Sequence, residues 1–361
     1  MNICWPYRRH KMWYPTGDKH NAMKYKSVIV TKRGGPEVLQ VIESDLRLPS
    51  AGEARIKILA APVCLPDVEA RYGRSPFKPK IPFVPGYAII GDVDAVGRQR
   101  RPSGEGVTKA AVGDRVASLT IYGGYGEYIF LGEEKLIPIS TTSDPAEAAP
   151  LILNYIVAYQ TLHRSAKVKA GDKVLIIGAS GGIGTAFLQL GQLANLTMYG
   201  IASKSKHHIL TEYGATPIDY RTQDFVEVIR KAEPDGLEAV FDGIGGDYIK
   251  RGFSLLRRGG TYVGYANPLS LSRTLRFLGQ VILFNLLPNG RSAKYYGTGS
   301  SRLNRRPFLE DWATLFKLLE EGKIKPVITK KFPILEAAQA NRLLESGQVI
   351  GNIVLLAPEL L

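Results

Sequence analysis

The sequence predicts an α/β protein in two parts, a mostly β first part followed by a doubly wound parallel sheet. Three observations support this prediction. The chain has 361 residues, which is enough for two ordinary domains. Short apolar runs separated by Gly and Pro fill residues 24–150. After residue 150, apolar strands alternate with helical segments, a pattern typical of a parallel sheet covered by helices.

The first part begins with residues 1–23, which lack helical or strand periodicity and are expected to form an irregular extension. Turn signals such as Arg33-Gly34-Gly35-Pro36 then separate short β segments. The expected strands are 27–31, 53–60, 87–96 and 115–119.

The sequence pattern changes from strand-like to helix-like at Asp144. Asp144 precedes Pro145 and an alanine-rich run, which predicts a capped helix start. A helical stretch is expected over 155–167. The strands expected after it are 173–177, 197–202, 216–219, 239–242 and 261–264. The helices expected between and after them are 184–193, 206–213, 224–232, 248–256, 309–321 and 335–346, with a last strand at 352–356.

Composition excludes several classes of protein. Two cysteines, Cys4 and Cys64, exclude a disulfide scaffold and a four-cysteine zinc site. No apolar run reaches the roughly 20 residues of a membrane span, and the N-terminus lacks the apolar region of a secretory signal. No Ser-His-Asp or Cys-His pattern indicates a hydrolase. We therefore expect a soluble, cytoplasmic protein.

Charge is the unusual feature of the composition. The chain has 47 Lys and Arg against 33 Asp and Glu, a formal net charge of +14, which favours anionic partners. Residues 248–309 contain eleven basic residues and no acidic one. An exposed basic segment would give weak, salt-sensitive contact with an anionic membrane or RNA, and so a location at a membrane surface stays open.

The glycine-rich run after residue 177 predicts a dinucleotide site. Residues 173–177 form an apolar strand, and Gly178-Ala-Ser-Gly-Gly-Ile-Gly184 turns it into a helix. Glycines at such a turn let backbone N–H groups approach a pyrophosphate, and the helix N-terminus offers partial positive charge. The alternative, a tight turn required only for packing, is weaker because the run lies inside a β-α-β unit.

The end of the second strand indicates which dinucleotide is bound. An NAD site normally has Asp or Glu there, whereas this chain has Ala202-Ser203-Lys204-Ser205-Lys206. A carboxylate would repel a 2′-phosphate, and a hydroxyl with lysines would bind one. NADPH is therefore the expected cofactor, the alternative being that these lysines only cover a helix start.

The chain from about residue 24 to 361 resembles the zinc-free quinone oxidoreductases of the medium-chain dehydrogenase/reductase superfamily. The motifs that carry the resemblance are 179–184, 202–206, Pro217-Ile-Asp-Tyr220, Leu255-Leu-Arg-Arg-Gly-Gly260, Pro82-Phe-Val-Pro-Gly86 and Lys323-Ile-Lys-Pro326. Leu153-Asn-Tyr-Ile156, together with Ala202–Lys206, is most similar to the branch of the vesicle amine transport protein homologues.

The resemblance implies a fold and a cofactor site. A GroES-like catalytic domain would comprise residues 24–150 and return at 299–361, and a Rossmann domain would comprise 151–298. Ser180, Gly181, Gly182 and Ile183 would lie at the pyrophosphate, and Ser203, Lys206 and Tyr220 at the adenosine 2′-phosphate. Gly264, Tyr265 and Ala266 would lie at the nicotinamide, and Asn352 would be a late cofactor contact.

This sequence departs from the zinc-dependent relatives at one place and from the zinc-free relatives at another. Cys64 stands where the zinc-dependent relatives place a metal-binding Cys, but Gly86 is followed by Tyr87-Ala88 instead of His-Glu. A single thiolate cannot hold tetrahedral zinc, so no metal is expected. Zinc-free relatives usually carry Asn at the Cys64 position, which leaves the usual polar contact near the nicotinamide in doubt.

Candidate catalytic residues are Cys64 and the loop tyrosines Tyr72, Tyr87 and Tyr122, any of which might otherwise only pack. Asp67 is expected to order its loop through backbone hydrogen bonds. The preferred function is NADPH-dependent, zinc-independent reduction of a quinone or an α,β-unsaturated carbonyl. The alternative is a non-catalytic or moonlighting NADPH-binding protein that associates with RNA or an anionic membrane. The apolar run 277–287 is expected to form a homodimer interface, with membrane docking as the alternative.

Overall fold

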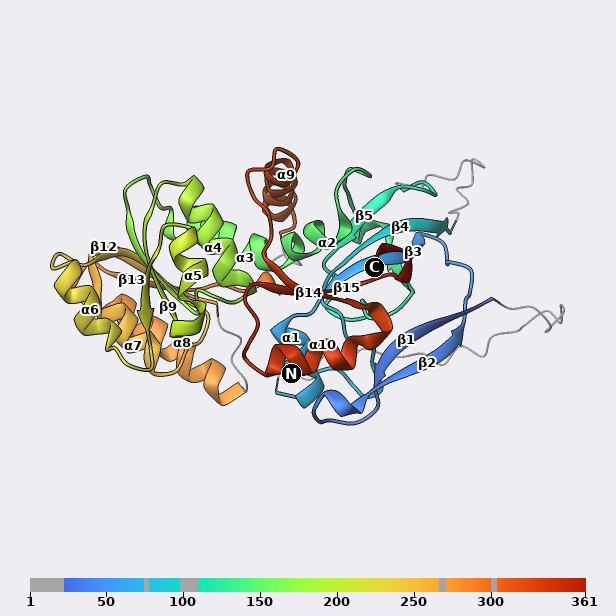
Figure 1. The fold of residues 1–361 in the computed structure, drawn as a ribbon, viewed down its shortest axis with the longest axis horizontal. Coiled ribbons are helices and arrows are strands. Elements are labelled where there is room, and N and C mark those ends of the chain that lie inside the picture. Colours follow the sequence, from blue (N-terminus) through green and yellow to red (C-terminus); the bar gives the residue numbers. More distant parts are fainter. Residues whose placement is uncertain (1–22, 75–77, 98–109, 266–270, 300–303) are drawn as a thin grey trace.

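A computed structural model describes residues 23–74, 78–97, 110–265, 271–299 and 304–361. The predicted extension therefore lies outside the described residues, apart from Met23. The described chain forms two lobes side by side, one with a parallel sheet and helices on both faces and one mostly β (Figure 1).

The parallel sheet confirms the doubly wound α/β prediction. Among the described residues it has six strands in the order β10-β9-β8-β11-β12-β13, all parallel. The strands are β8 (Lys173–Ile177), β9 (Thr197–Ala202), β10 (Thr216–Asp219), β11 (Leu237–Asp242), β12 (Leu256–Gly264) and β13 (Ser292–Tyr295). Side chains alternate across the sheet, so Val174 and Ile176 enter one hydrophobic core and Leu175 and Ile177 the other.

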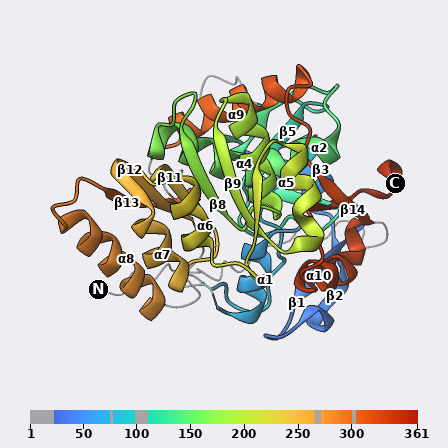
Figure 2. The ribbon, with the colours of Figure 1, turned by 60° about the vertical axis from the view of Figure 1, so that its left-hand side comes forward.

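Helices cover both faces of this sheet. The first core also contains residues of α3 (Asn154–Gln160), α4 (Gly182–Leu193) and α5 (His207–Glu212). The second contains residues of α6 (Phe225–Ala232), α7 (Asp247–Ser254) and α8 (Leu271–Leu286). Figure 2 shows α8 and β13 together at one side of the lobe, and the side-chain amide of Asn285 joins them through two hydrogen bonds to the backbone of Ala293.

The mostly β lobe has a mixed sheet in the order β14-β15-β3-β4-β5-β7, with β6 also paired to β3, and a hairpin of β1 and β2. The strands are β1 (Lys24–Val30), β2 (Leu39–Asp45), β3 (Glu53–Pro62), β4 (Ile89–Val96), β5 (Arg115–Ser118), β6 (Tyr128–Gly132), β7 (Ile137–Pro138), β14 (Ile328–Pro333) and β15 (Asn352–Leu356). The helices outside the parallel-sheet lobe are α1 (Leu65–Tyr72), α2 (Pro145–Ala148), α9 (Arg306–Glu320) and α10 (Ala337–Glu345). Because β15 pairs antiparallel with β3, the end of the chain completes a sheet begun near its start.

Two predicted helices end differently in the structure. Leu256 does not end α7 but begins β12, where it pairs with Leu237. The stretch 155–167 changes from α-helix to a π-helical turn over Thr161–Ala166, and Lys167 ends it at φ 56°. The Thr161 hydroxyl donates to the carbonyls of Val157 and Ala158, a bond type that commonly bends helices.

The region 277–287 forms most of α8 and remains apolar on its outer side. Leu275, Ile282, Leu283 and Leu286 are all more than half exposed, and they recur at helical spacing. No helix within the described ranges is both long and apolar enough to cross a membrane.

Candidate functional site

The carboxyl ends of the parallel strands bring the predicted cofactor residues to one edge. Strand pairing aligns Ile201, Ile177, Asp242, Gly264 and Tyr295 across β9, β8, β11, β12 and β13. The strand order reverses between β8 and β11, because β9 and β10 are added on one side of β8 and the later strands on the other. In open parallel sheets such a reversal forms a crevice that binds ligands.

The glycine turn lies at this reversal and begins α4. Gly178 has φ 87°, a left-handed conformation that favours glycine. Gly184 packs against the start of the turn, where a Cβ would lie 2.3 Å from the Gly178 carbonyl oxygen. Gly181 caps α4, and of the described atoms the nearest to a Cβ built there is the Gly178 oxygen at 3.8 Å. The Cβ side of Gly181 is therefore open at the start of α4, whose first-turn N–H groups can receive a pyrophosphate.

The other predicted members of the turn pack more closely. Ser180 is buried, and its carbonyl accepts a hydrogen bond of 2.9 Å from Gly351 N. Gly182 lies against the side chains of Asn154 and Asn352. Ile183 is half-buried against the core that also contains α3 and α4.

Lys206, after the second strand, contacts the end of the chain. Its Nζ donates to the carbonyl oxygens of Gly347 at 2.6 Å and Val349 at 2.8 Å. Partial burial lowers the pKa of Lys206. No carboxylate among the described residues forms an ion pair with it, so the cation has neutral partners. Such a cation can still attract an anion.

Ser203 and Tyr220 lie at the same edge as Lys206, because β9 and β10 pair through Ala202 and Asp219. The Ser203 hydroxyl is 3.3 Å from the Ser205 hydroxyl. Tyr220 is 48% exposed, and the guanidinium of Arg221 lies 5.7 Å from its ring centroid.

The carboxylate of Asp219, at the end of β10, is engaged in its own turn. Asp219 accepts hydrogen bonds from Arg221 N and the Thr222 hydroxyl. These bonds give it a structural role in the turn after β10.

The predicted nicotinamide side lies at the ends of β11 and β12. Tyr265 N donates to the carbonyl of Asp242, the residue beside Gly264 in the strand pairing. The Asp242 carboxylate accepts from Tyr262 Oη at 2.6 Å and from Ile244 N and Gly245 N at 2.8 Å, which fixes the turn after β11. Ala266 lies outside the described residues.

Asn352, the predicted late contact, is buried at the start of β15. Its Oδ1 accepts from Asn154 Nδ2 at 2.6 Å, and its Nδ2 donates to the Val327 carbonyl at 2.9 Å. Asn154 was missed as a site residue, because its contact with residues 182 and 352 is not visible in local sequence.

Cys64 is buried at the N-cap of α1, where burial raises the pKa of its thiol. Its backbone N–H donates to Asp67 Oδ2 at 3.2 Å, and Gly86 N donates to Asp67 Oδ1 at 2.8 Å. Asp67 thus orders its loop through backbone hydrogen bonds, as predicted. Within the described ranges, no group of three His, Cys, Asp or Glu side chains could hold a metal ion.

The candidate tyrosines have different surroundings. Tyr72 donates to Glu345 on α10 at 2.8 Å, and the guanidinium groups of Arg71 and Arg74 lie over its ring. Tyr122 packs edge-on against Phe83. Tyr87 belongs to the β lobe, and its hydroxyl lies 3.3 Å from that of Thr298, beyond β13. Tyr87 is therefore the candidate that contacts the segment leaving the carboxyl edge of the parallel sheet.

A chain of polar side chains near Tyr87 was not predicted. Tyr296 Oη donates to Gln160 at 2.8 Å, and Gln160 donates to Asp311 at 2.6 Å. The guanidinium of Arg164 also binds Asp311. Burial, with a smaller effect of Asp311 and Tyr87, raises the pKa of Tyr296 strongly, so its phenol keeps its proton.

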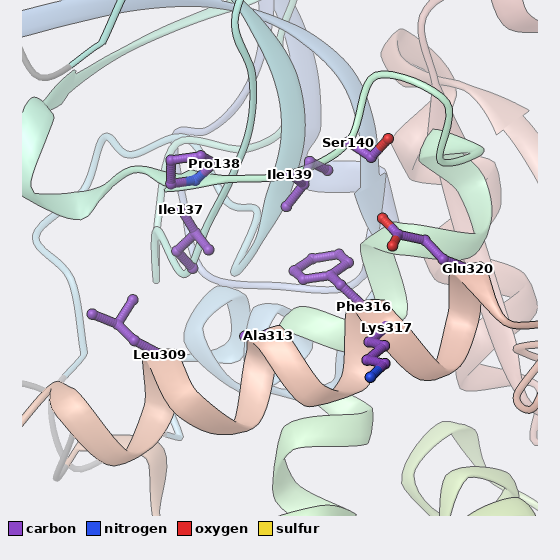
Figure 3. Close-up of a pocket in the computed structure, with 9 residues that line it drawn as sticks. All are labelled: Ile137, Pro138, Ile139, Ser140, Leu309, Ala313, Phe316, Lys317 and Glu320. Carbon is purple, nitrogen blue, oxygen red and sulfur yellow. The ribbon is translucent and has the colours of Figure 1, made fainter.

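A cavity of about 460 Å³ lies between α9 and the segment 137–140. Figure 3 shows that α9 supplies one wall, through Leu309, Ala313 and Phe316, and that the segment 137–140 supplies the other. None of the predicted site residues lines it.

The basic segment 248–309 is partly neutralised by acids from elsewhere in the chain. Among the described residues its ion pairs are Arg251–Asp224, Arg257–Glu238 and Arg306–Glu310. The expectation from the segment's own composition therefore overestimated its local positive field.

Comparison with known proteins agrees with this architecture. Residues 50–141 match the family described as alcohol dehydrogenase GroES-like domain, and residues 213–355 match the family described as zinc-binding dehydrogenase. Both lobes are thus of the kinds found in two-lobed dehydrogenases. The chain belongs to the medium-chain dehydrogenase/reductase superfamily, as the resemblance predicted.

Its relatives there include two groups. The synaptic vesicle membrane protein VAT-1 homolog of Homo sapiens is 33% identical over 322 residues, covering 85% of this chain and 80% of that protein. The quinone oxidoreductase of Sus scrofa is 30% identical over 339 residues, covering 91% and 97%. The solved structure of Escherichia coli quinone oxidoreductase complexed with NADPH has a TM-score of 0.80 at 25% identity, covering 92% of this chain and 99% of that chain.

Proposed function

We propose that this protein is an NADPH-dependent, zinc-independent reductase of quinones or α,β-unsaturated carbonyl compounds. The observation that carries the proposal is Lys206, a cation with two carbonyl partners, which follows Ser203 by three residues just beyond the end of β9. A 2′-phosphate is the dinucleotide group that would complement this charge. The Escherichia coli quinone oxidoreductase, solved with NADPH, supports the same cofactor.

Different residues of the site would bind different parts of NADPH. The open turn at Gly181 and the start of α4 would hold the pyrophosphate, with Ser180, Gly182 and Ile183 shaping the turn. Ser203, Lys206 and Tyr220 would hold the adenosine end, and Gly264 and Tyr265 would border the nicotinamide. When bound, NADPH supplies a hydride for the acceptor, and the protein orients both and excludes water.

The acceptor gains a hydride from NADPH and a proton from a hydroxyl or from water, so that a quinone becomes a hydroquinone and NADPH becomes NADP⁺. We propose Tyr87 as the protein hydroxyl for this step, because it meets Thr298 beyond the carboxyl end of β13. Tyr72 and Cys64 are weaker candidates, since Tyr72 donates to Glu345 and the Cys64 thiol is buried. Zinc independence is supported by Tyr87-Ala88, which cannot replace His-Glu as metal ligands.

We also propose a homodimer formed through α8. Within the described ranges β13 pairs only with β12, and on its other side the Asn285 amide of α8 occupies the N–H and C=O of Ala293. The exposed leucines and Ile282 of α8 therefore provide the surface for the second copy. A second copy related by a twofold axis would cover this apolar stripe. The two lobes are proposed as the domains 24–150 with 299–361, and 151–298, in a cytoplasmic protein.

The experiment that tests the proposed reaction is an anaerobic acceptor screen followed by the absorbance of the reduced nicotinamide. The panel comprises a naphthoquinone, an ortho-quinone, an enone and a saturated ketone. We expect oxidation of NADPH with the quinones or the enone and none with the saturated ketone. If the protein binds NADPH but does not oxidise it in the presence of any of these acceptors, the result would instead support the non-catalytic alternative.

A further inference from the structure

A single short segment of the β lobe, Gly347 to Asn352, contacts both ends of the candidate nucleotide site. At one end, the carbonyls of Gly347 and Val349 accept hydrogen bonds from Lys206. At the other, Gly351 N donates to Ser180 O at 2.9 Å, and Gly351 forms a β-bridge with Gly181. The glycine turn of one lobe is therefore held by the backbone of the other.

Two buried asparagines, Asn154 and Asn352, form a further part of this contact between the lobes. Asn154 Nδ2 donates to Asn352 Oδ1 at 2.6 Å, and Asn352 is anchored to the Val327 carbonyl through both its Nδ2 and its backbone N–H. Asn154 is 9% exposed and Asn352 is 3% exposed. Asn154 begins α3, so the pair joins a helix start to a strand start 198 residues away.

The amide pair packs directly on the glycine turn. A Cβ built on Gly182 would lie 2.5 Å from Asn154 Nδ2 and 2.7 Å from Asn352 Oδ1. Real Cβ atoms do not approach so closely. The amides therefore occupy the space beside Gly182, whereas the Cβ side of Gly181 is open.

We propose that Asn154 and Asn352 are positioning residues for dinucleotide binding, which hold the glycine turn by contact with Gly182 and act through it. Loss of this support lets the turn move and misaligns the N–H groups that receive the pyrophosphate. NADPH and NADH share the pyrophosphate, so both should lose affinity by the same factor. The proposal rests on the proposed function in that a dinucleotide binds at this turn.

The test compares dissociation constants of the full-length protein and variants by calorimetry. We expect Asn154→Ala to raise Kd about tenfold for NADPH and for NADH alike, as loss of one buried hydrogen bond implies. The matched control is Asn341→Ala, which removes a buried asparagine bonded within α10, away from the glycine turn, and should leave both constants unchanged. If Asn154→Ala does not unfold cooperatively, and so is not properly folded, Asn154→Ser replaces it in the measurement.

A double-mutant cycle separates positioning from general destabilisation. Gly182→Ala introduces the methyl group that the amides exclude, and Asn154→Ala removes one of the atoms it would strike. The double variant should therefore lose less affinity than the two single losses combined. Additive losses, or a folded Asn154→Ala protein that binds within twofold of the unmutated one, would overturn the proposal. If the unmutated protein binds neither dinucleotide, the proposed function fails, and the positioning role fails with it.

Discussion

The Lys206 ammonium lies 2.6 Å from the carbonyl oxygen of Gly347, a residue 141 positions further along the chain. Lys206 follows the second strand of the parallel sheet, whereas Gly347 belongs to the C-terminal part of the β lobe. A charged side chain of one lobe is thus oriented by neutral backbone groups of the other.

Replacing Lys206 should change cofactor preference. A charge-assisted contact is worth about 1.5–3 kcal/mol, so Lys206→Ala should raise the Kd for NADPH by roughly 10- to 150-fold. NADH has no 2′-phosphate and should lose much less affinity. Lys231→Ala removes the same charge from an exposed position on α6 and is the matched control. Equal losses for both dinucleotides in Lys206→Ala would mean that Lys206 only joins the lobes.

A side chain at Gly181 should block the cofactor without disturbing the fold. Gly181 has φ −80° and ψ 180°, an extended conformation that valine adopts readily. The new side chain would occupy the open space in front of α4. We expect Gly181→Val to unfold near the temperature of the unmutated protein while showing no NADPH binding by calorimetry. Gly279→Ala, on α8, has open space at its Cβ and should bind normally.

Asp67 should make stability depend on pH. Burial raises the pKa of its carboxyl from 3.8 to about 7, against the effect of its backbone hydrogen bonds. The folded state therefore binds the proton more tightly than the unfolded state. The stability from this group is complete below about pH 4 and is lost as the pH rises toward 7.

Asp67→Asn removes this titration while keeping an oxygen that can accept from Gly86 N. Urea unfolding at a series of pH values should give a difference, unmutated minus variant, that falls between about pH 4 and 7 and then levels off. A difference that is flat or that rises over this range would show that Asp67 is ionised in the folded protein.

The proposed dimer should depend on the outer side of α8. Ile282 and Leu283 are 61% and 57% exposed, so replacing both with Asp should leave the fold intact but place charges in the interface. Light scattering after gel filtration should show half the mass of the unmutated protein. Val112→Asp, at a position 64% exposed in the β lobe, should keep the dimer. An unmutated protein that is already monomeric, and that binds acidic vesicles through α8, would favour membrane docking instead.

Chelation should leave the activity intact. Cys64 has a buried thiol, and its loop is ordered by Asp67 through backbone hydrogen bonds. We expect an acceptor-dependent rate unchanged after extended dialysis against a chelator. Zinc at one atom per chain in active protein, lost together with activity, would contradict zinc independence.

Strands of the parallel sheet were the most predictable part of the fold. The expected bounds of β8, β9 and β10 agree with the structure, because short runs bounded by turn signals leave little choice of where a strand begins and ends. The bounds of β15, in the mixed sheet of the β lobe, also agree. β13 was not located, because Ser292–Tyr295 is short and only half apolar. It is a strand because β12 supplies a partner.

The part of the site that a single local motif forms could be predicted from the sequence. The part that contacts between the two lobes form could not. The glycine turn follows from local spacing, since Gly178, Gly181 and Gly184 each serve the same bend. The neighbours of Lys206 and the pairing of Asn154 with Asn352 depend on contacts across 141 and 198 residues. Local periodicity carries no information about such contacts.

The most direct test of the account is the affinity of the unmutated protein for NADPH and for NADH, measured by calorimetry under the same salt and pH. The Lys206 cation and the Ser203 hydroxyl at the end of β9 predict a Kd for NADPH at least about tenfold below that for NADH. Equal dissociation constants for the two dinucleotides would contradict the account.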